Sequence, residues 1–212
     1  MEREARTGLV LNVQRLSTED GPGIRSTVFL KQCPLSCRWC HNPESIRGLP
    51  ELQWLAARCI GCRSCATACP RGCLSLDPGV RIDRGRCEGC GACAEECPAN
   101  ALQVLGRRVG VEALVAELVK DRAYYDASGG GVTLSGGEPL AQPGFSTAVF
   151  AALKDRGIST AVDTCGFASG EAFEALLPYV DLVLFDLKTM DPGAHREFTG
   201  QSNEVILRNL AL

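Results

Sequence analysis

The sequence has little of three features that mark other classes of protein. It has no apolar run long enough to cross a membrane, aromatic residues make up only 6% of it, and its formal net charge of −3 arises from scattered charges without a basic stripe. Nothing at residues 1–4 resembles a secretory signal. We therefore expect a soluble cytoplasmic protein that binds neither membranes nor nucleic acids, with one sizeable domain and a small insert.

Cysteine, by contrast, is abundant, with 13 among 212 residues. Two runs have the spacing C-x2-C-x2-C-x3-C-P, which is typical of bacterial ferredoxins that hold two four-iron clusters. In such runs the fourth cysteine binds the cluster of the other run. One cluster is therefore assigned to Cys59, Cys62, Cys65 and Cys97, and the other to Cys87, Cys90, Cys93 and Cys69.

A third motif has a different spacing. Cys33, Cys37 and Cys40 form a C-x3-C-x2-C run, which offers three thiolates where a four-iron cluster has four corners. One iron is then left without a protein ligand, and an open metal position can bind a substrate, as it does in catalytic zinc sites. The spacing therefore predicts a catalytic cluster rather than one that only passes electrons.

Two other uses of cysteine are disfavoured. A disulfide framework suits small secreted domains, whereas this chain is larger and shows no secretory signal. Zinc usually takes paired C-x2-C units, and these runs are triplets. Cys73 and Cys165 remain outside the three motifs, and we interpret both as free thiols; Cys73 occupies the place that Ala101 holds in the second run.

Outside the ferredoxin-like runs, strand and helix patterns alternate. We expect strands at residues 8–13, 26–30, 131–135, 160–163 and 182–186, and helices at 111–120, 148–156, 171–177 and 203–210. Each ferredoxin-like run ends in an apolar segment, at 74–76 and 102–104, that can form a short strand. Continuously apolar strands that alternate with helices predict a parallel sheet with helices outside it.

Polar residues directly follow four of the expected strands. The cysteine run follows residue 30, Gly-Gly-Glu follows the strand at 131–135, and the last two strands lead into Asp163 and Asp186. In a barrel of parallel strands, active sites lie at this carboxyl-terminal rim, so the shared placement predicts one site. Taken singly, Gly-Gly-Glu-Pro is an ordinary loop, and Lys188 could form a structural salt bridge with Asp186 or Asp191.

Together these motifs resemble the glycyl-radical enzyme activating enzymes of the radical S-adenosylmethionine (SAM) superfamily, the group that includes pyruvate formate-lyase activating enzyme. The resemblance rests on the cysteine run at 33–40 and on residues 20–25, 41–45, 135–139, 163–166 and 186–188. It implies an α/β fold: a partial (β/α) barrel of the radical SAM type with an inserted two-cluster ferredoxin-like module. The expected domains are residues 1–50, the insert at 51–106, and the rest of the barrel at 107–212.

The resemblance also implies an oxidoreductase activity. The open iron would bind the amino and carboxylate groups of SAM, and reductive cleavage would give a 5′-deoxyadenosyl radical that takes hydrogen from a backbone glycine of a partner glycyl-radical enzyme. Three [4Fe-4S] clusters are implied, two of which would relay electrons from reduced flavodoxin or ferredoxin. Because such a radical must be shielded from water, we expect the partner's glycine loop to close the site.

Residue roles follow from the same resemblance. The residues implied to contact SAM are Trp39, Cys40, His41, Gly136, Gly137, Glu138, Asp163, Thr164, Asp186, Leu187 and Lys188. Glu138 would accept from the ammonium group, and Lys188 would face the carboxylate. Asp163 and Thr164 are candidates for the ribose or a monovalent cation. Asp186 would orient the methionyl part or the target glycine loop, so Lys188 and Asp186 join the three cysteines as catalytic candidates.

The sequence leaves two further interpretations open. A dedicated iron-sulfur electron carrier would use the insert alone and leave the rim motifs unexplained, whereas a radical SAM enzyme acting on a small molecule would share those motifs. Family members continue beyond the position of Leu212, where another strand should follow the helix at 203–210. We therefore predict a C-terminally truncated protein with an uncovered sheet edge, intact cluster ligands and reduced or absent activity.

Overall fold

The computed structural model describes residues 7–212. The chain forms two compact units: the barrel unit, made by the chain up to residue 48 together with residues 108–212, and the insert unit, residues 49–107. The predicted insert at 51–106 falls inside the second of these. Within the described residues, no helix is both long and apolar enough to span a membrane.

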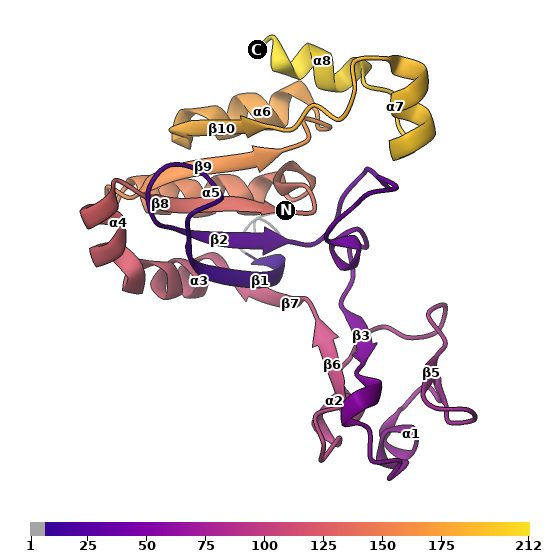
Figure 1. Ribbon diagram of the computed structural model, residues 1–212. Helices are drawn as coiled ribbons and strands as arrows, with labels where there is room; N and C mark the ends of the chain where they lie inside the picture. Colours follow the sequence, from indigo (N-terminus) through magenta and orange to yellow (C-terminus); the bar gives the residue numbers. More distant parts are fainter. Residues whose placement is uncertain (1–6) are drawn as a thin grey trace. The chain divides into compact units, whose positions relative to one another are not determined.

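The barrel unit is built on a six-stranded sheet. Its order across the sheet is β10 (Leu182–Phe185), β9 (Ser159–Thr164), β8 (Gly131–Gly136), β2 (Arg25–Leu30), β1 (Thr7–Ser17) and β7 (Arg107–Gly110). The four strands from β10 to β2 pair in parallel, with Val28 opposite Leu134 and Leu134 opposite Val162. Figure 1 shows these strands side by side with their carboxyl ends at one edge.

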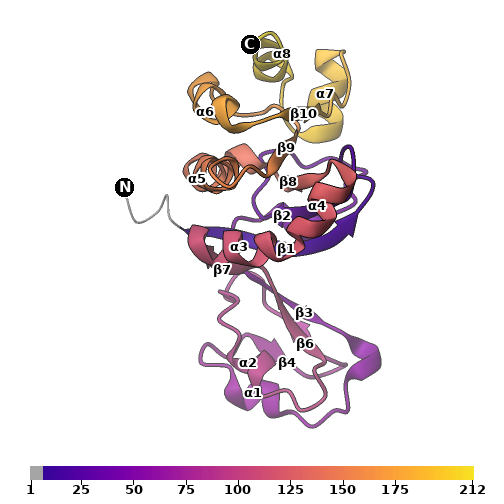
Figure 2. The ribbon, with the colours of Figure 1, turned by 90° about the vertical axis from the view of Figure 1, so that its left-hand side faces the viewer.

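Helices pack against this sheet. Its helical elements are α3 (Val111–Leu118), α4 (Arg122–Ser128), α5 (Pro143–Lys154), α6 (Gly170–Leu176), α7 (Pro192–Thr199) and α8 (Glu204–Leu210), with short 3-10 turns at Pro43–Ser45, Val119–Asp121, Pro139–Ala141 and Leu177–Tyr179. In Figure 2, α5 and α6 lie on the same side of the strands. Strands followed by covering helices are the arrangement that a partial (β/α) barrel requires.

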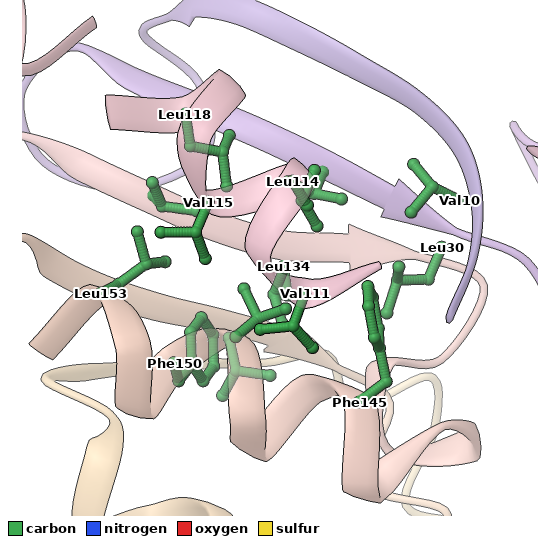
Figure 3. Close-up of a cluster of buried hydrophobic side chains, with 14 of the residues drawn as sticks. Val10, Leu30, Val111, Leu114, Val115, Leu118, Leu134, Phe145, Phe150 and Leu153 are labelled. Atoms are coloured by element: carbon green, nitrogen blue, oxygen red, sulfur yellow. The ribbon is translucent and has the colours of Figure 1, made fainter. Parts of the chain in front are cut away.

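The core of the barrel unit lies between the sheet and two of these helices. Figure 3 shows Leu114 of α3 and Phe150 of α5 packed against the strand residue Leu134. All three are fully buried. Burial of a side chain of this size stabilises a fold by about 1.5–3 kcal/mol. The apolar faces of the helices therefore hold the sheet, and with it the loops at its carboxyl edge.

The insert unit has a small core of its own. Strands β3 (Glu51–Trp54) and β6 (Leu102–Leu105) pair antiparallel, as do β4 (Leu74–Ser75) and β5 (Arg81–Ile82). Its helices are α1 (Ser64–Ala68) and α2 (Ala92–Glu95), with a 3-10 turn at Ala56–Arg58. Each helix follows a residue in the left-handed region, Arg63 or Gly91, so the two cysteine runs share one local geometry.

The structure adds two details of topology that the sequence left open. The strand predicted at residues 8–13 is antiparallel to β2, because the short connection through the turn at 20–23 reverses the chain. The apolar ends of the two cysteine runs form the short strands β4 and β6, which pair with β5 and β3 respectively. Seven elements were missed, all of eight residues or fewer: β3, β5, β7, α1, α2, α4 and α7.

Candidate active site

The C-x3-C-x2-C run occupies the loop after β2. Two backbone hydrogen bonds close the base of this loop, from Gln32 N to Ser45 O at 2.7 Å and from Cys33 N to Ile46 O at 3.0 Å. The three cysteines are half-buried, and Trp39 between them is 48% exposed. The loop thus presents its three sulfur atoms from a fixed base at the carboxyl end of β2.

A cavity of about 360 Å³, the site cavity, lies against this loop. It is lined by Cys33, Leu35, Cys37, Trp39, Cys40, His41, Asn42, Ser45, Ser135, Gly136, Gly137, Asp163, Cys165, Asp186 and Lys188. Its volume falls in the range of small-molecule sites, about 300–1,000 Å³. The loops that follow β2, β8, β9 and β10 therefore all contribute to one cavity.

Two polar pairs set the charge of the site cavity. Ser135 Oγ donates to Asp163 Oδ2 at 2.6 Å, and Lys188 forms an ion pair with Asp186. Burial raises the pKa of Asp163, although the Ser135 hydrogen bond opposes that rise. Burial by itself would lower the pKa of Lys188. The hydrogen bond to Asp186 and the negative charge of Asp186 act in the opposite direction, and the pKa of Lys188 is raised. The cavity wall therefore keeps one cation, Lys188, beside carboxylates.

Glu138 and Thr164 lie behind the wall rather than on it. Glu138 is fully buried, and its carboxylate accepts from Thr164 Oγ1 at 2.8 Å, from Cys165 N at 2.9 Å and from Leu140 N at 2.9 Å. Burial raises its pKa despite these donors. The carboxylate thus joins the loops after β8 and β9. A contact between Glu138 and the ammonium group of SAM would compete with these hydrogen bonds. That contact stays a prediction.

Gly136 and Gly137 line the site cavity where two backbone segments lie very close together. A Cβ on Gly136 would lie 2.4 Å from Leu30 N, and a Cβ on Gly137 would lie 2.4 Å from Gln32 O. The main chains after β2 and β8 therefore approach too closely for any side chain. Gly137 N also donates to Leu30 O at 2.8 Å, which fixes the two loops to each other.

Cys165 was interpreted as a free thiol, and the structure gives it a defined position. It lines the site cavity, is 7% exposed, and its Sγ lies 3.0 Å from Glu138 Oε2. A hydrogen bond from Cys165 lowers the pKa of the Cys33 thiol, and the same contact with burial raises that of Cys165. Cys165 thus donates its thiol hydrogen to Glu138 and lies next to Cys33. Its place after β9 was the sequence signal for such a role.

The insert unit holds two further cavities, each lined by four of the predicted cluster ligands. The first module cavity, about 240 Å³, is lined by Cys59, Cys62, Cys65 and Cys97 among others. The second module cavity, about 60 Å³, is lined by Cys69, Cys87, Cys90 and Cys93, with Cys73 also on its wall. Each cavity takes three cysteines from one run and the fourth from the other, which is the division of ligands predicted from the spacing; the number of clusters stays a prediction.

The two runs match in a further contact. Cys73 N donates to Cys69 Sγ at 3.3 Å, and Ala101 N donates to Cys97 Sγ at the same distance. Both donors are buried, at 4% and 2% exposure. Backbone N–H groups that point at a thiolate stabilise its charge, so the fourth cysteine of each run lies in an equivalent environment.

Three family matches cover the motifs. Residues 84–212 match the radical SAM superfamily. Residues 58–101 match a 4Fe-4S dicluster domain. Residues 19–54 match a 4Fe-4S single cluster domain. Iron-sulfur clusters and SAM are thus the cofactor classes of this fold, as the sequence predicted.

Relatives define the family more closely. The chain is 48% identical to the trans-4-hydroxy-L-proline dehydratase activating enzyme of Clostridioides difficile, over 96% of this chain and 68% of that protein. It is 44% identical to the isethionate sulfite-lyase activating enzyme of Nitratidesulfovibrio vulgaris, over 96% and 68%. The chain belongs to the glycyl-radical enzyme activating enzymes. The benzylsuccinate synthase activating enzyme of Thauera aromatica is 43% identical over 95% of this chain and 63% of that protein.

Membership in this family confirms the predicted fold class and the predicted radical SAM activase function, with a glycyl-radical enzyme as the class of partner. Among solved structures, a domain of pyruvate-formate lyase-activating enzyme from Bacteroides vulgatus is 41% identical over 38% of this chain and 50% of that chain, with a TM-score of 0.36. The site cavity is also lined by Ser135, Asn42 and Ser45, to which the sequence assigned no individual role. All three lie within the motifs at 41–45 and 135–139 on which the family resemblance rests.

Proposed function

We propose that this activating enzyme binds SAM in the site cavity and uses it to abstract hydrogen from a backbone glycine of a partner glycyl-radical enzyme. What supports the proposal is one observation: a single cavity is lined by Cys33, Cys37 and Cys40 together with Asp186 and Lys188. When bound there, a four-iron cluster with one open iron supplies the electron that splits SAM into methionine and a 5′-deoxyadenosyl radical.

The residues of the chain hold the nucleotide and exclude water. Lys188 attracts the SAM carboxylate because it carries the positive charge of the cavity, and the bare backbone at Gly136 and Gly137 gives room for the methionyl part. Asp163, with Thr164 behind it, binds the ribose or a monovalent cation. Trp39 and His41 border the cavity on the cluster-loop side and approach the nucleotide.

The loop after β10 faces the partner. Leu187 is 39% exposed between Asp186 and Lys188 and offers an apolar contact, while Asp186 orients the incoming glycine loop. Docking of that loop completes the exclusion of water, which a hydrogen-abstracting radical requires. Glu138 keeps the wall in place by joining the loops after β8 and β9.

The insert unit supplies the electron. Its two module cavities hold two [4Fe-4S] clusters, which makes three with the catalytic one, and reduced flavodoxin or ferredoxin in the cytoplasm is their electron source. The enzyme is thus an oxidoreductase of the glycyl-radical-activating class. A dedicated electron carrier would have no use for a cavity lined by Asp163 and Lys188. The family resemblance of residues 20–25 favours activation over small-molecule chemistry.

The test is SAM cleavage. The protein is reconstituted anaerobically with iron and sulfide, reduced, mixed with SAM and assayed for 5′-deoxyadenosine. We expect product from the wild type and at least about a hundredfold less from Lys188→Met, which keeps the side-chain length but removes the charge. Lys154→Met is the control, because Lys154 lies on α5 outside the site cavity. Fully assembled clusters without any product would contradict the proposal.

A further inference from the structure

The two cysteine runs of the insert unit carry opposite charge. Residues 59–76 contain Arg63 and Arg71 and no acidic residue, whereas residues 87–104 contain Glu88, Glu95 and Glu96 and no basic residue. An arginine directly precedes each run, Arg58 before the first and Arg86 before the second. The repeat is therefore uniform in its cysteine spacing but segregated in charge.

The basic run is exposed where it covers the first module cavity. Residues 56–63 are exposed without interruption, and Ile60 among them is 69% exposed. Cys59 and Cys62, two of the four ligands of this cavity, are exposed as well. Arg63 lines the cavity. A partner that touches residues 56–63 therefore comes directly against the ligands of one cluster.

The positive charge at the first module cavity is not neutralised. Across residues 7–212, no carboxylate forms an ion pair with Arg58 or Arg63, whereas at the second module cavity Arg71 pairs with Glu88 at 2.5 Å. Unpaired charges at a surface attract and orient a partner of opposite sign. Among the described residues, no carboxylate lines the first module cavity, so it attracts an acidic partner more strongly than the second, where Glu88 pairs with Arg71.

We propose that residues 56–63 form the docking surface for the electron donor, a small carrier protein with acidic residues around its redox centre. The inference rests on the proposed function, in which electrons enter through the insert unit. Arg58 and Arg63 steer the carrier, Ile60 makes the central apolar contact, and the acidic second run repels the same carrier. On docking, the carrier is oxidised by one electron and the centre held by Cys59, Cys62, Cys65 and Cys97 is reduced by one.

The experiment measures how fast the reconstituted holoenzyme takes electrons from a reduced acidic [2Fe-2S] ferredoxin in anaerobic stopped flow. Each rate is divided by the rate with photoreduced 5-deazariboflavin, an uncharged small reductant that needs no docking surface. Arg63→Glu is compared with Arg84→Glu, which makes the same charge change at an exposed arginine of the same unit that lines neither module cavity. Arg63→Lys tests whether a positive charge at this position is enough for fast electron uptake from ferredoxin.

We expect Arg63→Glu to lower the rate ratio about tenfold at low ionic strength, and the double variant with Arg58→Glu to lower it further. Arg84→Glu and Arg63→Lys should stay within about twofold of the wild type, and added salt should slow the wild type most. Equal effects of Arg63→Glu and Arg84→Glu would overturn the proposal. The proposal would also be overturned if the wild type self-associated and Arg63→Glu did not, because the surface would then bind a second copy of the chain.

The same preparations separate this inference from the proposed function. With 5-deazariboflavin as the reductant, wild-type enzyme should form 5′-deoxyadenosine from SAM. If it does, but Arg63→Glu takes electrons from ferredoxin at the wild-type ratio, then the docking surface is wrong and the activase function stands. If no 5′-deoxyadenosine forms although ferredoxin reduces the clusters in an Arg63-dependent way, then the proposed function fails and the docking surface stands.

Discussion

Asp121 shows how the barrel unit holds a buried charge. Its carboxylate is 1% exposed and accepts from Arg15 Nε at 2.7 Å and from Ser26 Oγ at 2.8 Å. Arg15, as hydrogen-bond donor, is the largest cause of the lowered pKa of this carboxyl. A buried carboxylate is tolerated only with such partners, so Asp121 ties the turn after α3 to β1 and β2.

Replacing Asp121 by Asn should lower the free energy of unfolding by about 2 kcal/mol, because Arg15 and Ser26 lose a charged acceptor. The folded-state pKa lies below the unfolded value of about 3.9, so this stabilisation is present above that value and is lost only as the pH falls below it. Urea unfolding followed by circular dichroism should therefore give the same difference from pH 8 to pH 5.

Asp126→Asn is the matched control for this prediction. Asp126 lies on the neighbouring helix α4, is 61% exposed, and pairs with Arg122 in an i,i+4 arrangement. Exposed pairs of this kind contribute less than about 1 kcal/mol. A difference between wild type and Asp121→Asn that already shrinks between pH 8 and pH 5 would contradict the lowered pKa.

At the scale of elements, α7 supports the cysteine loop. The carbonyl groups of Thr199 and Phe198, at the end of α7, accept from Ser36 N at 2.8 Å and from Arg38 N at 3.0 Å. The Phe198 ring lies under the Arg38 guanidinium, 5.2 Å from it, and 6.0 Å from the Trp39 ring. The loop that carries the three cysteines is thus held from a helix more than 150 residues later in the chain.

Gly200→Ala should disturb this support. Gly200 ends α7 with a φ of +82°, and a Cβ there would lie 2.8 Å from Ser36 Oγ. We expect a loss of about 1 kcal/mol from the left-handed backbone and, in addition, a displaced cysteine loop. The measurement is electron paramagnetic resonance of the reduced holoenzyme with and without SAM, in which the variant should show a weakened change on SAM addition.

Gly157→Ala provides the control for Gly200→Ala. Gly157 has a φ of +67°, so alanine costs a similar amount of backbone free energy there, but no heavy atom lies within 4 Å of its Cβ position. Its resonance spectra should respond to SAM as the wild type does. An unchanged SAM response in Gly200→Ala would show that α7 does not position the cluster loop.

At the scale of the whole molecule, iron content tests the division of cysteines between the two units. Cys33→Ala removes a ligand in the barrel unit, so about eight of twelve irons should remain and SAM cleavage should vanish. Cys73→Ala should keep about twelve irons, because Ala101 holds the equivalent place in the other run. Iron and sulfide analysis of both variants makes the measurement. A full loss of iron in Cys33→Ala would contradict three separate sites.

Local patterns in the sequence determined a large part of this protein. Cysteine spacing predicted the cluster type, because ligand spacing is a property of a short stretch of chain. Apolar periodicity predicted the positions of β2, β8, β9 and β10. Strand order along a parallel sheet then put their loops at one edge. The family resemblance followed from these motifs, and the relatives confirm it.

Only the tertiary structure decided which side chains face the site cavity. Glu138 and Thr164 belong to rim motifs yet lie behind the wall, while Cys165 and Ser135 line it. The support of the cysteine loop by α7 was equally invisible, since it joins segments far apart in the chain. Side-chain direction and long-range contacts depend on how whole elements pack, and no local pattern encodes that packing.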